Sequence, residues 1–554
     1  MAGLGKRDLL IASSFSVIFL ILAALNLGLV RAPNTYLQVE GRQDIQVTFE
    51  SNRTIGSLYL LTSSDSGMGL NIYVQKNDAW ESDWSLDKSG YYMWKKVDLG
   101  VTVETLRLSF VSWDLKIYEI VGLSPSGDQL TIRSGHLEGS NSSDAQWLFD
   151  EQDYFENPPT FLSETYFDEI YFVRAAQDYL DLHEPFEWTH PPLGKLILAL
   201  GIMAFSFSPF GWRIVGVLFA ALMIPMIYLF SKKVYKSTFA AAVSSLLLTF
   251  DFLHFTMARM GTVDTYLIFF SMVSALFFYL NFESLANGGK PIYKFIFLGI
   301  LSFSLSFAVK WTAVYGFVGQ ITLMIALGLK NFKYSNHEFL SMIKSISRSL
   351  AIILFSLVVG GLVYVSTFVP YMLIGHDPAD IYQAQWSMYN YHAGLTATHP
   401  FSSEWWMWPV IVKPLWLYNT QLPQGMVSTI TAMGNPVVWW FGLPFTILAI
   451  WKGLRKGEKS YLFISVLFMF QWLPYALISR TLFIYHYYPA VPMMIIASAG
   501  ILSDWWRDPK ERRLVQIYLV AVVAVFALFY PVISGYPIPY WYKESLQWLR
   551  SWTF

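Results

Sequence analysis

The chain has 554 residues, of which 54% are hydrophobic and only 14% are charged, whereas about a quarter of the residues of an average soluble protein are charged. This composition excludes an ordinary soluble enzyme, and a formal net charge of −1 provides no basic field for a nucleic-acid partner. The chain has no cysteine, which excludes disulfides, thiolate chemistry and cysteine-ligated metals.

Eleven apolar stretches predict membrane-spanning helices, because a span needs about 20 mostly apolar residues. The predicted spans are 9–30, 212–231, 237–255, 262–281, 294–309, 311–329, 349–370, 435–451, 460–478, 487–503 and 514–532. The first follows Lys6-Arg7 and lacks an obvious small-residue cleavage site, so we expect an uncleaved anchor over 1–31. The shorter apolar run Leu193–Phe207 follows two prolines and predicts an interfacial or re-entrant helix.

The positions of the basic residues predict the orientation of these spans. Lysine and arginine in short loops are retained on the cytoplasmic side, and half of the 38 basic residues fall in alternate short loops when the N-terminus is cytoplasmic. This topology places the C-terminus and two large segments, 31–211 and 371–434, outside. We therefore expect an integral protein of the plasma membrane whose chemistry occurs on the extracytoplasmic face.

Alternating apolar residues mark the first part of the outer segment. Runs such as Ile45-Val47-Phe49 and Leu106-Leu108-Phe110, separated by turn-forming residues, predict an extracytoplasmic β-sandwich over 36–140. Residues 141–211 then complete the first outer loop, and 212–554 form the transmembrane core. Four tryptophans can fill the core and rim of the sandwich or, if exposed, stack on sugar rings: Trp80, Trp84, Trp94 and Trp113.

Charged residues and histidines gather near the outer ends of the predicted spans, where charges are costly and often functional. They are Asp168, Glu169, Arg213, Arg259, Asp264, Lys310, Arg480 and His486. The cations can instead anchor span ends to lipid headgroups. His190, His392 and His399 lie far apart and lack metal-ligand spacing, so we expect them to position loops. No metal cofactor is expected, although a divalent ion is not excluded.

Several short motifs, in order, resemble the protein O-mannosyltransferase family. They are Phe167-Asp-Glu, His190-Pro-Pro-Leu-Gly-Lys, Gly211-Trp-Arg, Ala258-Arg-Met-Gly-Thr-Val-Asp and Val309-Lys-Trp, followed by Tyr391-His-Ala-Gly-Leu, His399-Pro-Phe-Ser-Ser, Gly434-Asn-Pro-Val-Val-Trp-Trp and Tyr485-His-Tyr-Tyr-Pro-Ala-Val-Pro. The later motifs are similar to prokaryotic members. The resemblance covers roughly 160–505 and implies the GT-C membrane glycosyltransferase fold, an Asp-Glu pair in the first outer loop and about eleven spans. Eukaryotic members have no β-domain before this pair and carry a separate domain in a later outer loop.

The resemblance implies transfer of mannose from polyprenyl (dolichyl) phosphate mannose to Ser/Thr hydroxyls of exported proteins, with inversion. An outward-facing transferase needs a lipid-linked donor, because nucleotide sugars are cytosolic. The resemblance marks Asp168 as the base. It also implies that Glu169 pairs with Arg213. We expect the donor phosphate to be bound by cations and histidine at span ends, namely Arg259, Lys310, Arg480 and His486. We expect support from His190, His399 and Asp264, the last by orienting Arg259.

Two alternatives remain open from the sequence. A GT-C enzyme of the same build can transfer another lipid-linked sugar, such as aminoarabinose, to a lipid or glycan. A membrane sugar receptor or transporter would keep the β-domain and the helices but would need no ionised base. A transporter predicts mid-membrane charges and duplicated halves with broken helices, whereas the charges here lie at outer span ends without duplication. The oligomeric state is not predicted.

Overall fold

The computed structural model describes residues 5–76, 79–138, 145–333 and 339–554. The chain divides into two compact units. The helical unit consists of Met1–Asn26, Ala175–Leu200 and Arg213–Phe554. The β unit consists of Leu27–Arg174 and Gly201–Trp212.

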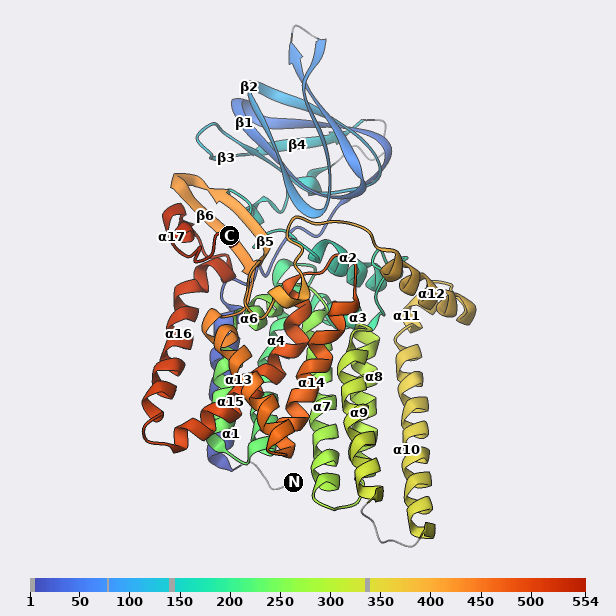
Figure 1. Cartoon of the computed structure of the whole chain (residues 1–554). Coiled ribbons are helices and arrows are strands. Elements are labelled where there is room, and N and C mark those ends of the chain that lie inside the picture. The colour runs from blue at the N-terminus through green and yellow to red at the C-terminus, as the bar shows by residue number, and fades with distance from the viewer. Residues whose placement is uncertain (1–4, 77–78, 139–144, 334–338) are drawn as a thin grey trace. The chain divides into compact units, whose positions relative to one another are not determined.

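The helical unit contains a bundle of long apolar helices (Figure 1). Its first members are α1 (Lys6–Ala24), α4 (Pro209–Tyr235), α5 (Thr238–Thr249), α6 (Phe252–Ala258), α7 (Asp264–Ala286), α8 (Tyr293–Val309) and α9 (Ala313–Lys333). The later members are α10 (Phe339–Ser366), α13 (Pro436–Arg455), α14 (Lys459–Trp472), α15 (Val491–Arg507) and α16 (Arg512–Ser534). Helix α7 packs against α8 and α9, while α13 packs against α14 and α15.

Seven of the predicted spans are confirmed as helices long and apolar enough to cross a membrane. These helices are α1, α4, α7, α10, α13, α14 with its 3-10 extension η5 (Leu473–Leu477), and α16. The other predicted spans correspond to the bent pair α5–α6, the shorter apolar helices α8 and α9, and the 17-residue α15. The protein is therefore a polytopic α-helical membrane protein, and eleven spans remain a prediction.

The third predicted span, 237–255, is not one straight helix. Helices α5 and α6 meet at an angle of 57°, because Asp251 begins a new helix by accepting a hydrogen bond from the His254 amide (2.9 Å). At the end of α5, the side-chain amide of Asn435 donates to the Phe250 carbonyl (2.9 Å). These two contacts satisfy backbone groups that the break would otherwise leave without partners.

The segments between the long helices carry their own short elements. Helix α2 (Glu169–Leu180) begins in the β unit, and α3 (Leu193–Phe205) is a 13-residue apolar helix. At 1.5 Å per residue, α3 reaches only about 20 Å, less than a bilayer core. The second large segment forms α11 (Val369–Leu373), α12 (Pro378–Gly394), β5 (Leu415–Leu422) and β6 (Met426–Ala432). Strand β7 (Ile538–Pro539) joins that hairpin, in the order β5-β6-β7, and α17 (Tyr540–Ser545) follows it.

The β unit contains a four-stranded sheet, and the sandwich arrangement stays a prediction. Its strands are β1 (Leu37–Lys76), β2 (Ala79–Leu123), β3 (Gln129–Leu130) and β4 (Ile132–Leu137), in the order β3-β2-β1-β4. Strands β1 and β2 have many register shifts and pair more than once, so that Leu70 lies opposite both Leu86 and Phe110. The predicted alternation is confirmed, because Ile45, Val47 and Leu108 are fully buried in one apolar core.

The tryptophans of the β unit divide between core and surface. Trp94 is buried, whereas the Trp113 side chain is 80% exposed. Trp113 is therefore exposed enough to stack on a sugar ring. Trp94 is a buried structural residue, which is the other role that the sequence allowed.

Candidate active site

Lys310 lies at the end of α8, where the backbone turns extended and the helix stops. Its ammonium group is 2.9 Å from the Asp264 carboxylate and lies over the Tyr485 ring, 5.6 Å from the centroid. Asp264 is the first residue of α7. The ion pair is mostly buried, so it holds a cation where α8 ends and α7 begins. The partner shown for Asp264 is thus Lys310, where the sequence suggested Arg259.

Arg480 contacts His392, which lies within electrostatic reach of Lys310. A guanidinium nitrogen of Arg480 lies 2.9 Å from Nδ1 of His392, which is near the end of α12, and His392 Nε2 lies 2.9 Å from the Thr189 carbonyl oxygen. Arginine can only donate and a carbonyl can only accept. His392 is therefore the neutral tautomer with its proton on Nε2.

His392 stays neutral because of its surroundings. Burial, followed by the neighbouring His190 and Arg480, lowers the pKa of His392 to about 4, and Lys310 acts in the same direction. The rings of His190 and His392 are 5.1 Å apart. His392 therefore lies within electrostatic reach of His190, Arg480 and Lys310, and His190 lies within reach of Lys310.

A buried ion pair fixes the loop that carries His190. The Lys195 ammonium donates to Glu187 Oε2 (2.7 Å), the Glu187 carbonyl (2.6 Å) and the His190 carbonyl (2.7 Å), and its side chain is completely buried. Glu187 Oε1 accepts from the Thr189 amide (3.0 Å) and from Nδ1 of His190 (2.9 Å). Burial raises the pKa of Glu187, but the charges of Lys195 and His190 outweigh it and leave the pKa well below its usual range.

His486 and His399 flank the same region. His486 is buried and stacks on Tyr485 (4.6 Å between centroids), the ring that Lys310 covers. Lys310 and Arg480 both lie within electrostatic reach of His486. His399 contacts the Phe483 ring (5.1 Å) and accepts a hydrogen bond from the Phe401 amide (3.2 Å), so it contributes to the packing of this turn.

Arg259 is engaged in a different place. Its guanidinium donates to the carbonyls of Ala23, Leu25 and Asn26 at the end of α1 (2.6 to 2.7 Å) and to that of Ser534 (3.1 Å). The side chain is 3% exposed. These contacts stabilise the end of α1, and we leave Arg259 out of the donor site proposed below.

The Asp168-Glu169 pair lies in the β unit, in a tight turn that begins α2. Phe167 has a positive φ of 49°, and the Asp168 carbonyl accepts from the amides of Tyr171 (3.1 Å) and Phe172 (3.2 Å). Glu169 is fully buried, and its carboxylate accepts a hydrogen bond from the Tyr166 amide (3.2 Å). Arg213 is fully buried and is the first residue of the last segment of the helical unit, and its pairing with Glu169 stays a prediction.

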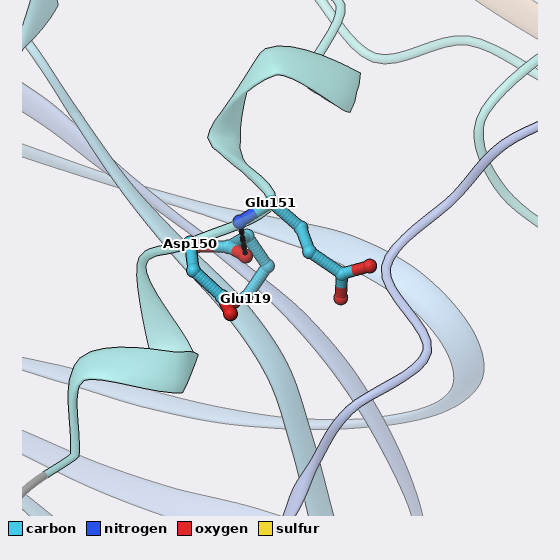
Figure 2. A group of neighbouring side chains, drawn as sticks. All are labelled: Glu119, Asp150 and Glu151. Carbon is cyan, nitrogen blue, oxygen red and sulfur yellow. Dashed lines mark hydrogen bonds between the residues drawn. The ribbon is translucent and has the colours of Figure 1, made fainter.

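Among the described residues, one acidic group has the spacing to hold a metal ion: Glu119, Asp150 and Glu151 (Figure 2). Glu119 Oε2 accepts from the Glu151 amide (3.0 Å), and Oε1 accepts from the Ile120 amide (3.3 Å). Burial raises the pKa of Glu119 to about 9. The two amide hydrogen bonds to Glu119 tie β2 to the segment after it.

Two family models match the chain. Residues 189–360 match "Dolichyl-phosphate-mannose-protein mannosyltransferase", and residues 378–552 match "C-terminal four TMM region of protein-O-mannosyltransferase". The chain belongs to the protein O-mannosyltransferase family. Two curated relatives are named polyprenol-phosphate-mannose–protein mannosyltransferase. The Mycobacterium tuberculosis protein is 24% identical over 70% of this chain and 86% of its own length. The Corynebacterium glutamicum protein is 26% identical over 66% and 81%.

The fold agrees with this membership. A chain of the S. cerevisiae protein O-mannosyltransferase complex bound to the sugar donor matches 70% of this chain and 89% of its own length, with a TM-score of 0.60 and 13% identity. The protein thus has the fold of a GT-C membrane glycosyltransferase. The family models cover the residues around Lys310 and Arg480, whereas both matched ranges begin after the β-domain and Asp168.

Three residues of this candidate site were not among the predicted site residues: Glu187, Lys195 and His392. Lys195 is the only charged residue in the apolar run 193–205, which is a sequence signal for a buried ion pair. His392 was predicted only to position a loop. Its role at Arg480 depends on a contact across 88 residues that spacing does not reveal.

Proposed function

We propose that the protein transfers mannose from polyprenyl-phosphate-mannose to Ser or Thr hydroxyls of exported proteins, on the extracytoplasmic face of the plasma membrane. The observation that carries the proposal is the cationic cluster of Lys310 and Arg480 with the uncharged His392, in a chain of the protein O-mannosyltransferase family. Cations at span ends suit a phosphate that sits at the interface while its polyprenyl chain lies among apolar helices.

In the proposed mechanism, Lys310 and Arg480 bind the donor phosphate and stabilise the charge that develops as it leaves. His486 supports them from the adjoining aromatic stack. The bond between the anomeric carbon and the phosphate oxygen breaks as the acceptor oxygen attacks from the opposite face, so the configuration inverts. The phosphate departs as a weakly basic group, and no general acid is needed.

The acceptor hydroxyl must lose its proton during attack, and we assign this role to Asp168 as the general base. The proposed support for Asp168 comes from Glu169, which pairs with Arg213. His190 Nδ1 lies 2.9 Å from Glu187 Oε1. We propose that the His190 ring helps to orient the acceptor. No metal enters these steps.

The test is transfer of labelled mannose from polyprenyl-phosphate-mannose to a Ser/Thr-rich peptide by the purified protein. The control is the same peptide with every Ser and Thr replaced by Ala. Label on the first peptide alone, in an alkali-labile linkage, supports the proposal. Donor binding without transfer to either peptide would instead favour another acceptor or sugar, and absence of donor binding would favour a receptor or transporter.

A further inference from the structure

One strand segment of the β unit holds the residues that directly precede Asp168. This segment, Tyr91–Trp94 of β2, is here called the strand clamp. The Thr165 amide donates to the Tyr92 carbonyl (3.2 Å), and the Thr165 hydroxyl donates to the Tyr91 carbonyl. The Trp94 amide donates to the Glu164 carboxylate (3.1 Å).

The strand clamp is itself fixed in place. Tyr92 is fully buried and has a positive φ of 50°, and its amide donates to the Ser63 hydroxyl (2.8 Å) while its own hydroxyl donates to the Pro33 carbonyl (2.7 Å). A non-glycine residue keeps this conformation only where its surroundings hold it. The clamp is therefore a rigid part of the β unit.

The same clamp contacts the segment that leads into the helical unit. The Tyr92 ring packs edge-to-face on Phe207 (5.1 Å between centroids) and on Trp212 (5.6 Å). Trp212 is fully buried and is followed directly by Arg213. One strand segment thus contacts both the chain before Asp168 and the chain before Arg213.

The segment from Thr165 to Asp168 is short, and hydrogen bonds between Tyr166 and Glu169 close its turn. Two residues, Tyr166 and Phe167, separate them, and consecutive Cα atoms are about 3.8 Å apart. The Glu169 amide donates to the Tyr166 carbonyl (3.1 Å), and the Glu169 carboxylate accepts from the Tyr166 amide (3.2 Å). The turn is therefore rigid, and a displacement of Thr165 is transmitted to Asp168.

We propose that the strand clamp is a positioning element for Asp168, and thus that the β-domain serves the transfer reaction by orienting the base. This inference rests on the proposed function, because it takes Asp168 as the base. Loss of the clamp should reduce kcat and leave donor affinity unchanged, since the donor is bound by residues of the helical unit. A domain that selects acceptors would instead change the KM for the peptide.

The test compares Thr165→Val, which keeps the shape of the side chain and removes its hydroxyl, with Thr165→Ser, which keeps the hydroxyl. Thr54→Val is the matched control, since it removes a hydroxyl that pairs with Thr102 on the exposed surface of the same sheet. We expect Thr165→Val to lower kcat by about tenfold or more, with an unchanged Kd for polyprenyl phosphate and an unchanged peptide KM. Thr165→Ser should restore most of kcat.

Hydrogen–deuterium exchange of the full-length protein gives a readout that does not depend on activity. Thr165→Val should speed exchange over 166–172, whereas Thr165→Ser and Thr54→Val should not. Equal exchange and equal kcat in Thr165→Val and the parent would overturn the inference, and so would a changed peptide KM with parental kcat. If Thr165→Val does not fold, Thr165→Ala takes its place. A parent that transfers no mannose contradicts the proposed function, and exchange alone then decides whether the clamp holds the turn.

Discussion

His392 accepts a hydrogen bond from Arg480 at 2.9 Å while it donates to the Thr189 carbonyl at the same distance. One uncharged imidazole thus ties three segments that are far apart in the sequence. Because Thr189 is bonded to Glu187, the orientation of Arg480 depends on the buried Glu187–Lys195 pair as well as on His392. In the proposed donor site, this series of hydrogen bonds orients the Arg480 guanidinium toward the phosphate.

Two substitutions of His392 separate its two hydrogen bonds. The side-chain oxygen of asparagine can replace Nδ1, so His392→Asn keeps an acceptor for Arg480, whereas the amide of His392→Gln reaches the position of Nε2 and leaves Arg480 without that acceptor. A hydrogen bond to a charged group contributes about 1.5–3 kcal/mol. We therefore expect His392→Gln to raise the Kd for polyprenyl phosphate by roughly tenfold or more and His392→Asn to raise it much less.

An Arg480→Met background provides the control for this comparison. If His392 acts through Arg480, His392→Gln has little further effect once Arg480 is replaced, so the two effects are not additive. Fully additive effects would show that His392 contributes to donor binding by another route. Equilibrium binding of fluorescent polyprenyl phosphate measures both.

The lowered pKa of His392 predicts how donor binding depends on pH. A histidine whose pKa is about 4 in the folded protein stays neutral down to that pH. Protonation would remove the acceptor for Arg480 and place two positive charges together. We expect the donor KM to stay flat between about pH 8 and pH 5.5. A donor KM that rises with an apparent pKa near 6.5 would contradict this account of His392.

The ion pair of Glu187 and Lys195 should be a large determinant of stability. Lys195→Met leaves a buried carboxylate without its cation, which costs about 3–5 kcal/mol of unfolding free energy. The double variant Glu187→Leu/Lys195→Met removes both charges and should recover part of this loss. Thermal unfolding in detergent measures the difference. A Lys195→Met protein as stable as the parent would show that the pair does not hold the loop.

The same pair sets an acid limit on stability. The pKa of Glu187 lies below its unfolded value of 4.5, so its contribution is present at neutral pH. That contribution is lost as the pH falls below about 4.5 toward the folded-state pKa. The parent should therefore lose more stability on acidification than Glu187→Gln. Thermal unfolding measured across this pH range tests the expectation. Equal losses of stability in the two proteins would contradict the stabilising role of ionised Glu187.

Arg259 and Lys310 should behave differently when each is replaced by methionine. Arg259→Met removes a guanidinium that bonds four carbonyls at the end of α1 and near α16, so it should lower thermal stability and leave the donor Kd of the folded fraction near parental. Lys310→Met should raise the donor Kd by about tenfold or more with a smaller loss of stability. Binding and unfolding of both variants decide this, and a selective loss of donor affinity in Arg259→Met would return Arg259 to the donor site.

The sequence identified candidate site residues from their positions at the ends of predicted spans. Lys310, Arg480 and His486 were chosen because they lie at the ends of predicted spans. In the structure Lys310 lies over the Tyr485 ring, His486 stacks on the same ring, and both cations lie within electrostatic reach of His486. His392 acts through a hydrogen bond to a distant segment, and hydrophobic periodicity carries no information about such contacts. Glu187 and Lys195 were missed for the same reason, although a lysine in an apolar run is a usable signal.

The sequence likewise predicted only part of the fold. Alternation in 36–140 identified the buried face of the β-domain, but it does not determine which strands pair, and the long strands β1 and β2 pair along more than one register. The sequence contains a signal for the bend between α5 and α6 that the predicted span 237–255 did not take into account. Asp251 interrupts an apolar run, and an aspartate in that setting is a helix N-cap more readily than an interior residue.

The most direct test of the proposed reaction is a comparison of the parent with Asp168→Asn in the same two assays: binding of polyprenyl phosphate and transfer of labelled mannose to a Ser/Thr-rich peptide. The substitution keeps the shape of the side chain and removes the base. The account predicts equal binding in both proteins, with transfer reduced by at least about a hundredfold in Asp168→Asn. Transfer by Asp168→Asn at the parental rate would contradict it.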